Sequence, residues 1–240
     1  MEQVLRVTPV VGLPQFNGWS HVWELSLDPQ TKCVICIGIA GDNAGNIGRD
    51  ITENIAQMPP RSAQGLYQTI EDCIKLATDQ QGKLSIAGGI FKNKRSIFAT
   101  FNSTILLKRG PKVGRIIQSE SEPQIIEGKF DTDDVFVFST DAARQFLSQV
   151  ELSFQRGYDS DGVITGIVPA LHSIEDSSTC ALAFILVTEE DENQPMYVPP
   201  AMEIDIQTTS DEESPLLSVE QEPEPDFSPD LGADTAVSQS

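Results

Sequence analysis

The sequence divides into segments with two different spacings of apolar residues. Residues 32–40 and 180–187 are continuous apolar runs with the length of buried strands. Residues 46–58 instead carry apolar side chains at steps of three or four, the spacing of one face of a helix, and Pro59 and Pro60 follow at once. The chain therefore combines strands with amphipathic helices.

The same reasoning assigns the remaining segments. The predicted strands are residues 4–11, 20–27, 32–40, 84–91, 96–101, 104–108, 113–117, 135–138 and 180–187, and the predicted helices are 46–58, 62–78, 142–155 and 162–171. Strands occur in runs and do not alternate strictly with helices, which favours antiparallel sheets. The predicted fold class is α+β: a four-layer αββα sandwich of two antiparallel sheets flanked by helices, with the first two helices as an antiparallel pair.

Residues 189–240 have a different composition. They hold fifteen of the 36 acidic residues, seven of the fifteen prolines and no Lys or Arg. Such a segment buries too little apolar area to offset the entropy of ordering the chain. We therefore expect one folded domain at residues 1–188 and an acidic, Pro-rich disordered tail at 189–240, with a charge that suits a basic partner.

Charge and hydropathy argue against several classes of function. The net charge is −20, and no part of the chain has the basic surface that nucleic acids require. The apolar runs are far shorter than the roughly 20 residues that span a bilayer, and the N-terminus does not resemble a signal peptide. The sequence favours a soluble cytoplasmic protein without a nucleic acid or membrane partner.

Four cysteines fit a reducing compartment. Cys33 and Cys36 have the spacing of half a redox or zinc motif, but residues i and i+3 of a strand face opposite sides of the sheet. The sequence has no second pair with this spacing. We interpret Cys33, Cys36, Cys73 and Cys180 as small buried apolar residues.

Three aspartates lie beside predicted strands. Asp42 and Asp141 follow strands, and Asp176 precedes the last one. A carboxylate in such a place is solvated, caps a helix or holds a metal ion. Taken one at a time, Asp42 and Asp141 are explained by capping of the helix that follows each of them, and Asp176 is explained by the ordinary composition of a loop. If the three strand ends converge at one edge of the sandwich, however, the carboxylates would form a site for a hard cation.

The turn at residues 41–46 leaves three interpretations open. Its two glycines would allow a phosphate cradle, although no Gly-Lys-Ser/Thr sequence follows. It would also serve as a metal-binding turn, with the carboxylate of Asp42 and the backbone carbonyl of Asn43 as ligands. The third interpretation is a helix cap with a tight turn. His21 and His172 have no Cys or His at ligand spacing, so we interpret them as surface or core residues.

The order of these motifs resembles the metal-dependent protein phosphatases of the PPM type, which include the protein phosphatase 2C and sporulation stage II protein E-like families. The resemblance covers about residues 15–188. It rests on Asp42-Asn43-x-Gly45 after a core strand, Ser139-Thr140-Asp141 between a strand and a helix, and Asp176-Ser177-Ser178-Thr179 before the last strand. The helix pair and the segment at residues 101–110 agree with it.

The resemblance implies a binuclear centre with two Mg²⁺ or Mn²⁺ ions. Asp42 would bridge the ions, the carbonyl of Asn43 would bind one, and Asp141 and Asp176 would hold the other. Two such cations activate a bridging water and neutralise a phosphoryl group. Asp42, Asp141 and Asp176 would then be the catalytic residues of a protein-serine/threonine phosphatase, a phosphoric monoester hydrolase with a phosphoprotein substrate.

The sequence also departs from the family pattern. Asn43 and Ala142 replace glycines, and residues 16–21, where the family has an acidic motif, contain no carboxylate. Glu24 is the nearest acidic residue, and Arg6 lies too far upstream to match the phosphate-binding arginine of some members. The alternative is a catalytically inactive pseudophosphatase that acts as a regulatory or phosphoprotein-binding module. A third hypothesis is an α+β scaffold whose tail recruits a basic partner.

Overall fold

The computed structural model describes residues 3–189, so the predicted disordered tail, apart from Glu189, lies outside the described residues. The strands are β1 (Gln3–Val11), β2 (Gly18–Asp28), β3 (Thr31–Ala40), β4 (Lys83–Lys92), β5 (Arg95–Phe101), β6 (Ser103–Arg109), β7 (Lys112–Gln118), β8 (Gln124–Lys129), β9 (Val135–Thr140) and β10 (Ala181–Glu189). The helices are α1 (Ala44–Gln57), α2 (Ala63–Asp79), the 3₁₀ helix η1 (Ala142–Phe146), α3 (Leu147–Gln155) and α4 (Ser160–His172).

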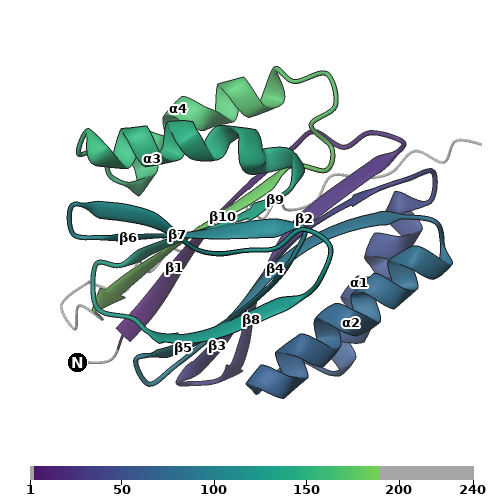
Figure 1. Ribbon diagram of the computed structural model, residues 1–240, viewed down its shortest axis with the longest axis horizontal. Helices are drawn as coiled ribbons and strands as arrows, with labels where there is room; N and C mark the ends of the chain where they lie inside the picture. The colour runs from purple at the N-terminus through teal and green to yellow at the C-terminus, as the bar shows by residue number, and fades with distance from the viewer. Residues whose placement is uncertain (1–2, 190–240) are drawn as a thin grey trace, which may run out of the picture. The chain divides into compact units, whose positions relative to one another are not determined.

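The described strands form two five-stranded sheets. The first sheet has the order β1-β10-β9-β6-β7, and the second has the order β2-β3-β4-β5-β8. The neighbouring strands in both sheets pair antiparallel. Helices α3 and α4 cover the outer face of the first sheet, and α1 and α2 cover that of the second (Figure 1). The predicted α+β sandwich is confirmed.

Alternation along the strands produces separate apolar layers. On β3, Cys33 and Ile35 pack against α1 and α2, whereas Val34 and Cys36 pack between the two sheets. The third layer lies between the first sheet and α3 and α4. The prediction that Cys33 and Cys36 face opposite sides is therefore confirmed, because successive side chains of a strand point to opposite faces.

The two predicted helices before β4 are also present. Helix α1 buries Ile47, Ile51 and Ile55, which form one helical stripe. Helix α2 begins after Ser62, whose Oγ accepts a hydrogen bond from the backbone N–H of Gly65. None of the helices within residues 3–189 is long and apolar enough to cross a membrane.

Two elements differ from the sequence prediction. The helix expected at residues 142–155 begins as the 3₁₀ helix η1 and becomes α-helical only at Leu147. Strand β8 was not predicted, because only Ile125 and Ile126 give it an apolar signal and its other side chains are mostly exposed. It is an edge strand of the second sheet, where polar side chains are tolerated.

Candidate functional site

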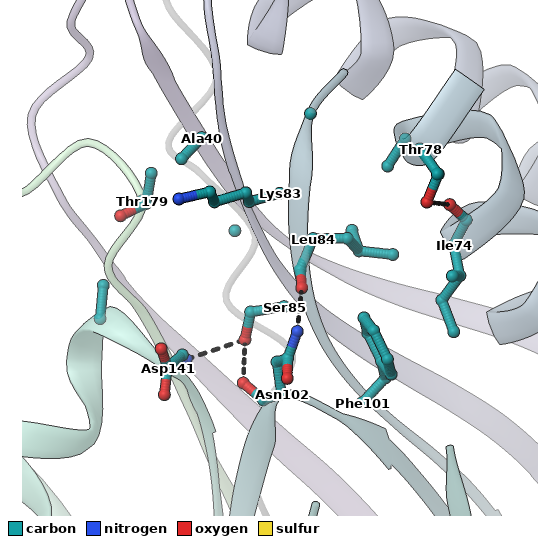
Figure 2. Close-up of a pocket in the computed structure, with 14 residues that line it drawn as sticks. Ala40, Ile74, Thr78, Lys83, Leu84, Ser85, Phe101, Asn102, Asp141 and Thr179 are labelled. Carbon is teal, nitrogen blue, oxygen red and sulfur yellow. Dashed lines mark hydrogen bonds between the residues drawn. The ribbon is translucent and has the colours of Figure 1, made fainter. Parts of the chain in front are cut away.

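A cavity of about 370 Å³ lies where the ends of both sheets meet α2. Its walls come from the end of β3, the start of β4, the β5–β6 connection, the residues after β9 and the loop before β10 (Figure 2). Asp141 and Lys83 are the charged residues that line it. The rest of the wall includes Ser85, Asn102 and Thr179 beside apolar side chains.

Strand alternation determines which side chains reach this cavity. Val34 and Cys36 of β3 face the first sheet, so Gly38 and Ala40, further along the same face, do so as well. On β4, Ala87 and Phe91 face the first sheet, and the same parity includes Ser85 and Lys83. Ala40 and Lys83 are also paired across β3 and β4. The pair thus brings a small side chain and a long cationic one to the mouth of the cavity.

Asp141 is held in place by its backbone and by an arginine. Its backbone N–H donates to Ser85 Oγ at 2.8 Å, and Ser85 Oγ donates in turn to the carbonyl of Asn102 (Figure 2). Its carboxylate lies 3.3 Å from Arg144 Nη1, one turn further along the chain. Arg144 is itself anchored, because its Nη2 donates to the carbonyl of Ser119 at 3.0 Å. The carboxylate therefore already has a cationic partner.

Asp42 does not line the cavity. Strand β3 ends at Ala40, and Gly41 turns the backbone with a φ of +139°, which favours glycine. Asp42 is exposed beyond this turn. The carbonyl of Asn43, predicted as a metal ligand, accepts hydrogen bonds from the backbone N–H groups of Asn46 and Ile47. It is thus engaged in the first turn of α1.

Asp176 also lies outside the cavity lining. Asp176 is exposed in the loop that ends at Cys180, just before β10. Its carboxylate accepts a hydrogen bond from Ser178 Oγ at 2.9 Å. Thr179 is the residue of this loop that lines the cavity. Ser177 is buried and its Oγ accepts from the backbone N–H of Leu13, so the loop is fixed against the β1–β2 connection.

The expected convergence of Asp42, Asp141 and Asp176 is not observed. Within residues 3–189, no three Asp, Glu, His or Cys side chains form a group that could hold a metal ion. Asp42 lies two residues after the end of β3, and Asp176 lies five residues before the start of β10. The positions that face the cavity are accordingly Ala40 and Thr179. The residues present do not fit a binuclear metal centre in this arrangement.

Sequence reasoning missed Lys83, Ser85, Asn102, Thr179 and Arg144. For two of them a signal existed, because Lys83 and Ser85 share the parity of Ala87: Ser85 already lies in the predicted strand, and a start one residue earlier would have included Lys83. Asn102 lies in the left-handed region, with a φ of 49°, between two strands. Its side-chain amide donates a hydrogen bond to the carbonyl of Leu84 at 3.0 Å. No sequence pattern predicts this contact.

The histidines lie apart from the cavity lining. The ring of His21 packs against Trp19 and Trp23 on β2, with ring centroids 5.8 Å and 4.7 Å away, and partial burial lowers the pKa of His21. His172 Nε2 lies 3.2 Å from the carbonyl oxygen of Val11.

Solved structures share this arrangement of sheets and helices. The serine/threonine phosphatase of S. agalactiae superposes with a TM-score of 0.56 and 11% identity, covering 78% of this chain and 100% of that one. This chain has the fold of the PP2C-type serine/threonine phosphatases. The catalytic domain of the phosphatase PstP, solved in complex with two manganese ions, gives a TM-score of 0.53 at 10% identity, with 78% of this chain and 100% of that chain covered.

A further counterpart is the PP2C phosphatase domain of the cell-fate determinant SpoIIE from Bacillus subtilis, solved with a fragment of its regulatory domain. It gives a TM-score of 0.57 at 10% identity, covering 79% of this chain and 65% of that one. No protein-family model matches the sequence, and the search of curated proteins gave no match. At these identities the likeness establishes the PP2C-type fold, and the chemistry must be argued from the cavity.

Proposed function

We propose that this chain is a pseudophosphatase: a phosphatase-like domain that acts as a regulatory or phosphoprotein-binding module. The observation that supports this proposal is the set of side chains around the cavity, where Asp141 is the carboxylate, Arg144 pairs with it, and Lys83 supplies a second positive charge. The PP2C-type fold supports a role connected with phosphorylated proteins.

The donor set explains why hydrolysis by two metal ions is disfavoured. Hard divalent cations take six or more oxygen ligands, with carboxylates among them to balance the charge. Two adjacent cations need several carboxylates, because each cation repels the other. The ammonium of Lys83 adds a further repulsion within the same cavity. A single carboxylate that is already paired with Arg144 does not offset the repulsion between the two cations and the repulsion from Lys83.

The second candidate is a metal-dependent serine/threonine phosphatase with Mg²⁺ or Mn²⁺ at Asp42, Asn43, Asp141 and Asp176. The similarity to PstP, which was solved with two manganese ions, favours it, as does the position of Asp141 on the cavity wall. It would require that Asp42, Asp141 and Asp176, which form no metal-binding group within residues 3–189, come within reach of the same ions. The carbonyl of Asn43 would also have to leave the first turn of α1.

A turnover assay separates the two candidates. We expect the full-length chain to release no phosphate from p-nitrophenyl phosphate or a phosphoserine peptide above the buffer rate, with or without millimolar Mn²⁺. Hydrolysis that depends on Mn²⁺ and disappears in Asp141→Asn would overturn the pseudophosphatase proposal and establish the second candidate. Activity that survives Asp141→Asn would place the chemistry outside this cavity.

A further inference from the structure

The cavity contains an unbalanced positive charge. Lys83 and Asp141 are its charged lining residues, and Arg144 balances Asp141 at 3.3 Å. Lys83, in contrast, forms no ion pair with an acidic side chain of residues 3–189. Lys83 is exposed, so its ammonium is free to bind an anion that enters the cavity.

The side chain of Lys83 extends from the first residue of β4 toward Thr179 and Ala40 (Figure 2). The neighbouring residues of β3 leave room for the Lys83 side chain because they are small. Ala40 is the cross-strand partner of Lys83, and Gly38 is the next residue on the same face of β3. The lysine ammonium offers three hydrogen-bond donors on a flexible stem. It can thus bind an anion with several acceptor oxygens without a change in the backbone.

The wall next to Lys83 is preorganised. Ser85 Oγ accepts from the backbone N–H of Asp141 and donates to the carbonyl of Asn102, and Asn102 Nδ2 donates to the carbonyl of Leu84. These bonds tie the two sheets together where a ligand would enter, so little ordering is left to occur on binding. Figure 2 shows this chain of contacts running along one side of the cavity.

The lining on the α2 side of the second sheet is apolar and includes Ile74 and Ala77 of α2 together with Leu84 and Phe101. A ligand that fits both walls has an anionic group beside an apolar one. The volume of about 370 Å³ lies in the range of small-ligand pockets, about 300–1,000 Å³. A modified side chain and its neighbour in a peptide meet these requirements.

We propose that Lys83 binds the phosphoryl group of a phosphorylated peptide in this cavity, without a metal ion. The inference rests on the proposed function as a pseudophosphatase and names the residue that would make it work. A phosphoryl group carries nearly two negative charges and three acceptor oxygens, which match the ammonium better than a carboxylate does. The peptide's adjoining apolar side chain would pack near Ile74 and Phe101.

The test uses the full-length, ¹⁵N-labelled chain in EDTA, titrated with a short phosphoserine peptide. We expect the amide signals of Ser85, Asp141 and Thr179 to shift. Lys83→Met should weaken binding about 10- to 100-fold, because a charge-assisted hydrogen bond is lost, and Lys83→Arg should retain most of it. The matched control is Lys112→Met, an exposed lysine at the start of β7 that does not line the cavity.

Peptides with unmodified serine or with glutamate in place of phosphoserine complete the titration. We expect neither to bind comparably, and equal binding of the glutamate peptide would overturn the assignment to a phosphoryl group. Unshifted cavity amides, or an unchanged affinity in Lys83→Met, would overturn the site itself. Because EDTA removes divalent ions, this result is independent of the turnover assay, which tests the pseudophosphatase proposal separately.

Discussion

At the scale of single residues, the cavity depends on small side chains at the strand ends. Gly38 lies on β3 where the loop before β10 crosses closely. A Cβ atom at this position would lie 2.2 Å from the carbonyl oxygen of Thr179 and 3.2 Å from Thr140 Cγ2. Because the first of these atoms belongs to the backbone, no rotamer change relieves the clash. The close approach requires glycine here.

We therefore predict that Gly38→Ala destabilises the domain by about 1–3 kcal/mol, the usual cost of overpacking a core. Chemical denaturation measures the change. Gly114→Ala is the matched control, since Gly114 also lies on a strand but has no heavy atom within 4 Å of an added Cβ. We expect that substitution to be neutral or slightly stabilising. Equal stability of the two variants would show that the loop before β10 moves away freely.

The cysteines give a prediction about pH. Burial raises the pKa of the Cys33 and Cys73 thiols to about 12 and that of Cys180 to about 11. Cys36 is buried as well, and its pKa is raised further by the same desolvation. In the unfolded chain these thiols would ionise near about pH 8.5. The unfolded state then holds fewer protons than the folded state at alkaline pH.

The stability that comes from keeping these thiols protonated is therefore fully present below about pH 8.5. It is lost as the pH rises through the pKa values of the thiols in the folded state. We expect the melting temperature to fall above about pH 9. Thiolate absorbance should be absent from the folded protein at that pH and present after unfolding in guanidinium chloride. Rapid reaction of the native chain with a thiol reagent at neutral pH would contradict the buried positions of the four cysteines.

At the scale of elements, a buried carboxylate holds together the end of the sandwich where β9 begins. Asp134 is 1% exposed and accepts hydrogen bonds from Arg109 Nε at 2.9 Å and Nη2 at 2.6 Å. Arg109 also donates a hydrogen bond to the carbonyl of Lys129. The guanidinium of this β6 residue therefore binds both β8 and the residues before β9. The hydrogen bonds to Asp134 raise the pKa of Arg109.

We predict that Asp134→Ala lowers the free energy of unfolding by about 2–3 kcal/mol. The loss of a buried, charge-assisted pair has a cost of this order, reduced here because the half-exposed Arg109 can still be hydrated. The control is Asp131→Ala, because its exposed carboxylate lies 3.6 Å from the same arginine. That variant should lose less than about 1 kcal/mol. Similar losses in both variants would mean that burial of Asp134 is unimportant.

At the scale of the whole molecule, folding stability reports on metal binding without any assay of catalysis. A ligand that binds only the folded state raises stability with its concentration. We predict that millimolar Mn²⁺ or Mg²⁺ leaves the melting temperature of the full-length chain unchanged, because the cavity presents one paired carboxylate and one ammonium. Differential scanning calorimetry with and without EDTA measures this.

Asp42→Ala and Asp141→Asn serve as comparisons for that measurement, and both should melt identically with and without the metal. A rise of several degrees in the wild-type chain that disappears in Asp42→Ala would favour the metal-dependent phosphatase. It would also mean that the exposed loop carrying Asp42 closes over the cavity when the ion binds.

Much of the architecture follows from the sequence. The four-residue steps of Ile47, Ile51 and Ile55 specify a helix with one buried face, and the alternation of β3 separates Cys33 from Cys36. These patterns hold because helices and strands repeat with fixed periods, so local spacing alone sorts side chains onto faces. The same periods, with strands in runs, were enough to identify the sandwich.

The site depended on information that local spacing does not contain. A strand ends where its neighbours stop pairing, and β3 ends at Ala40 because Gly18 and Lys83 are the last partners on either side. Side chains alternate with a period of two along these strands, so the pairing register decides which of them face the cavity. The sequence by itself determined the fold, whereas only the tertiary structure showed that Asp141, Ala40, Thr179 and Lys83 line one cavity and that Asp42 and Asp176 do not, because these residues meet through contacts between strand ends far apart in the chain.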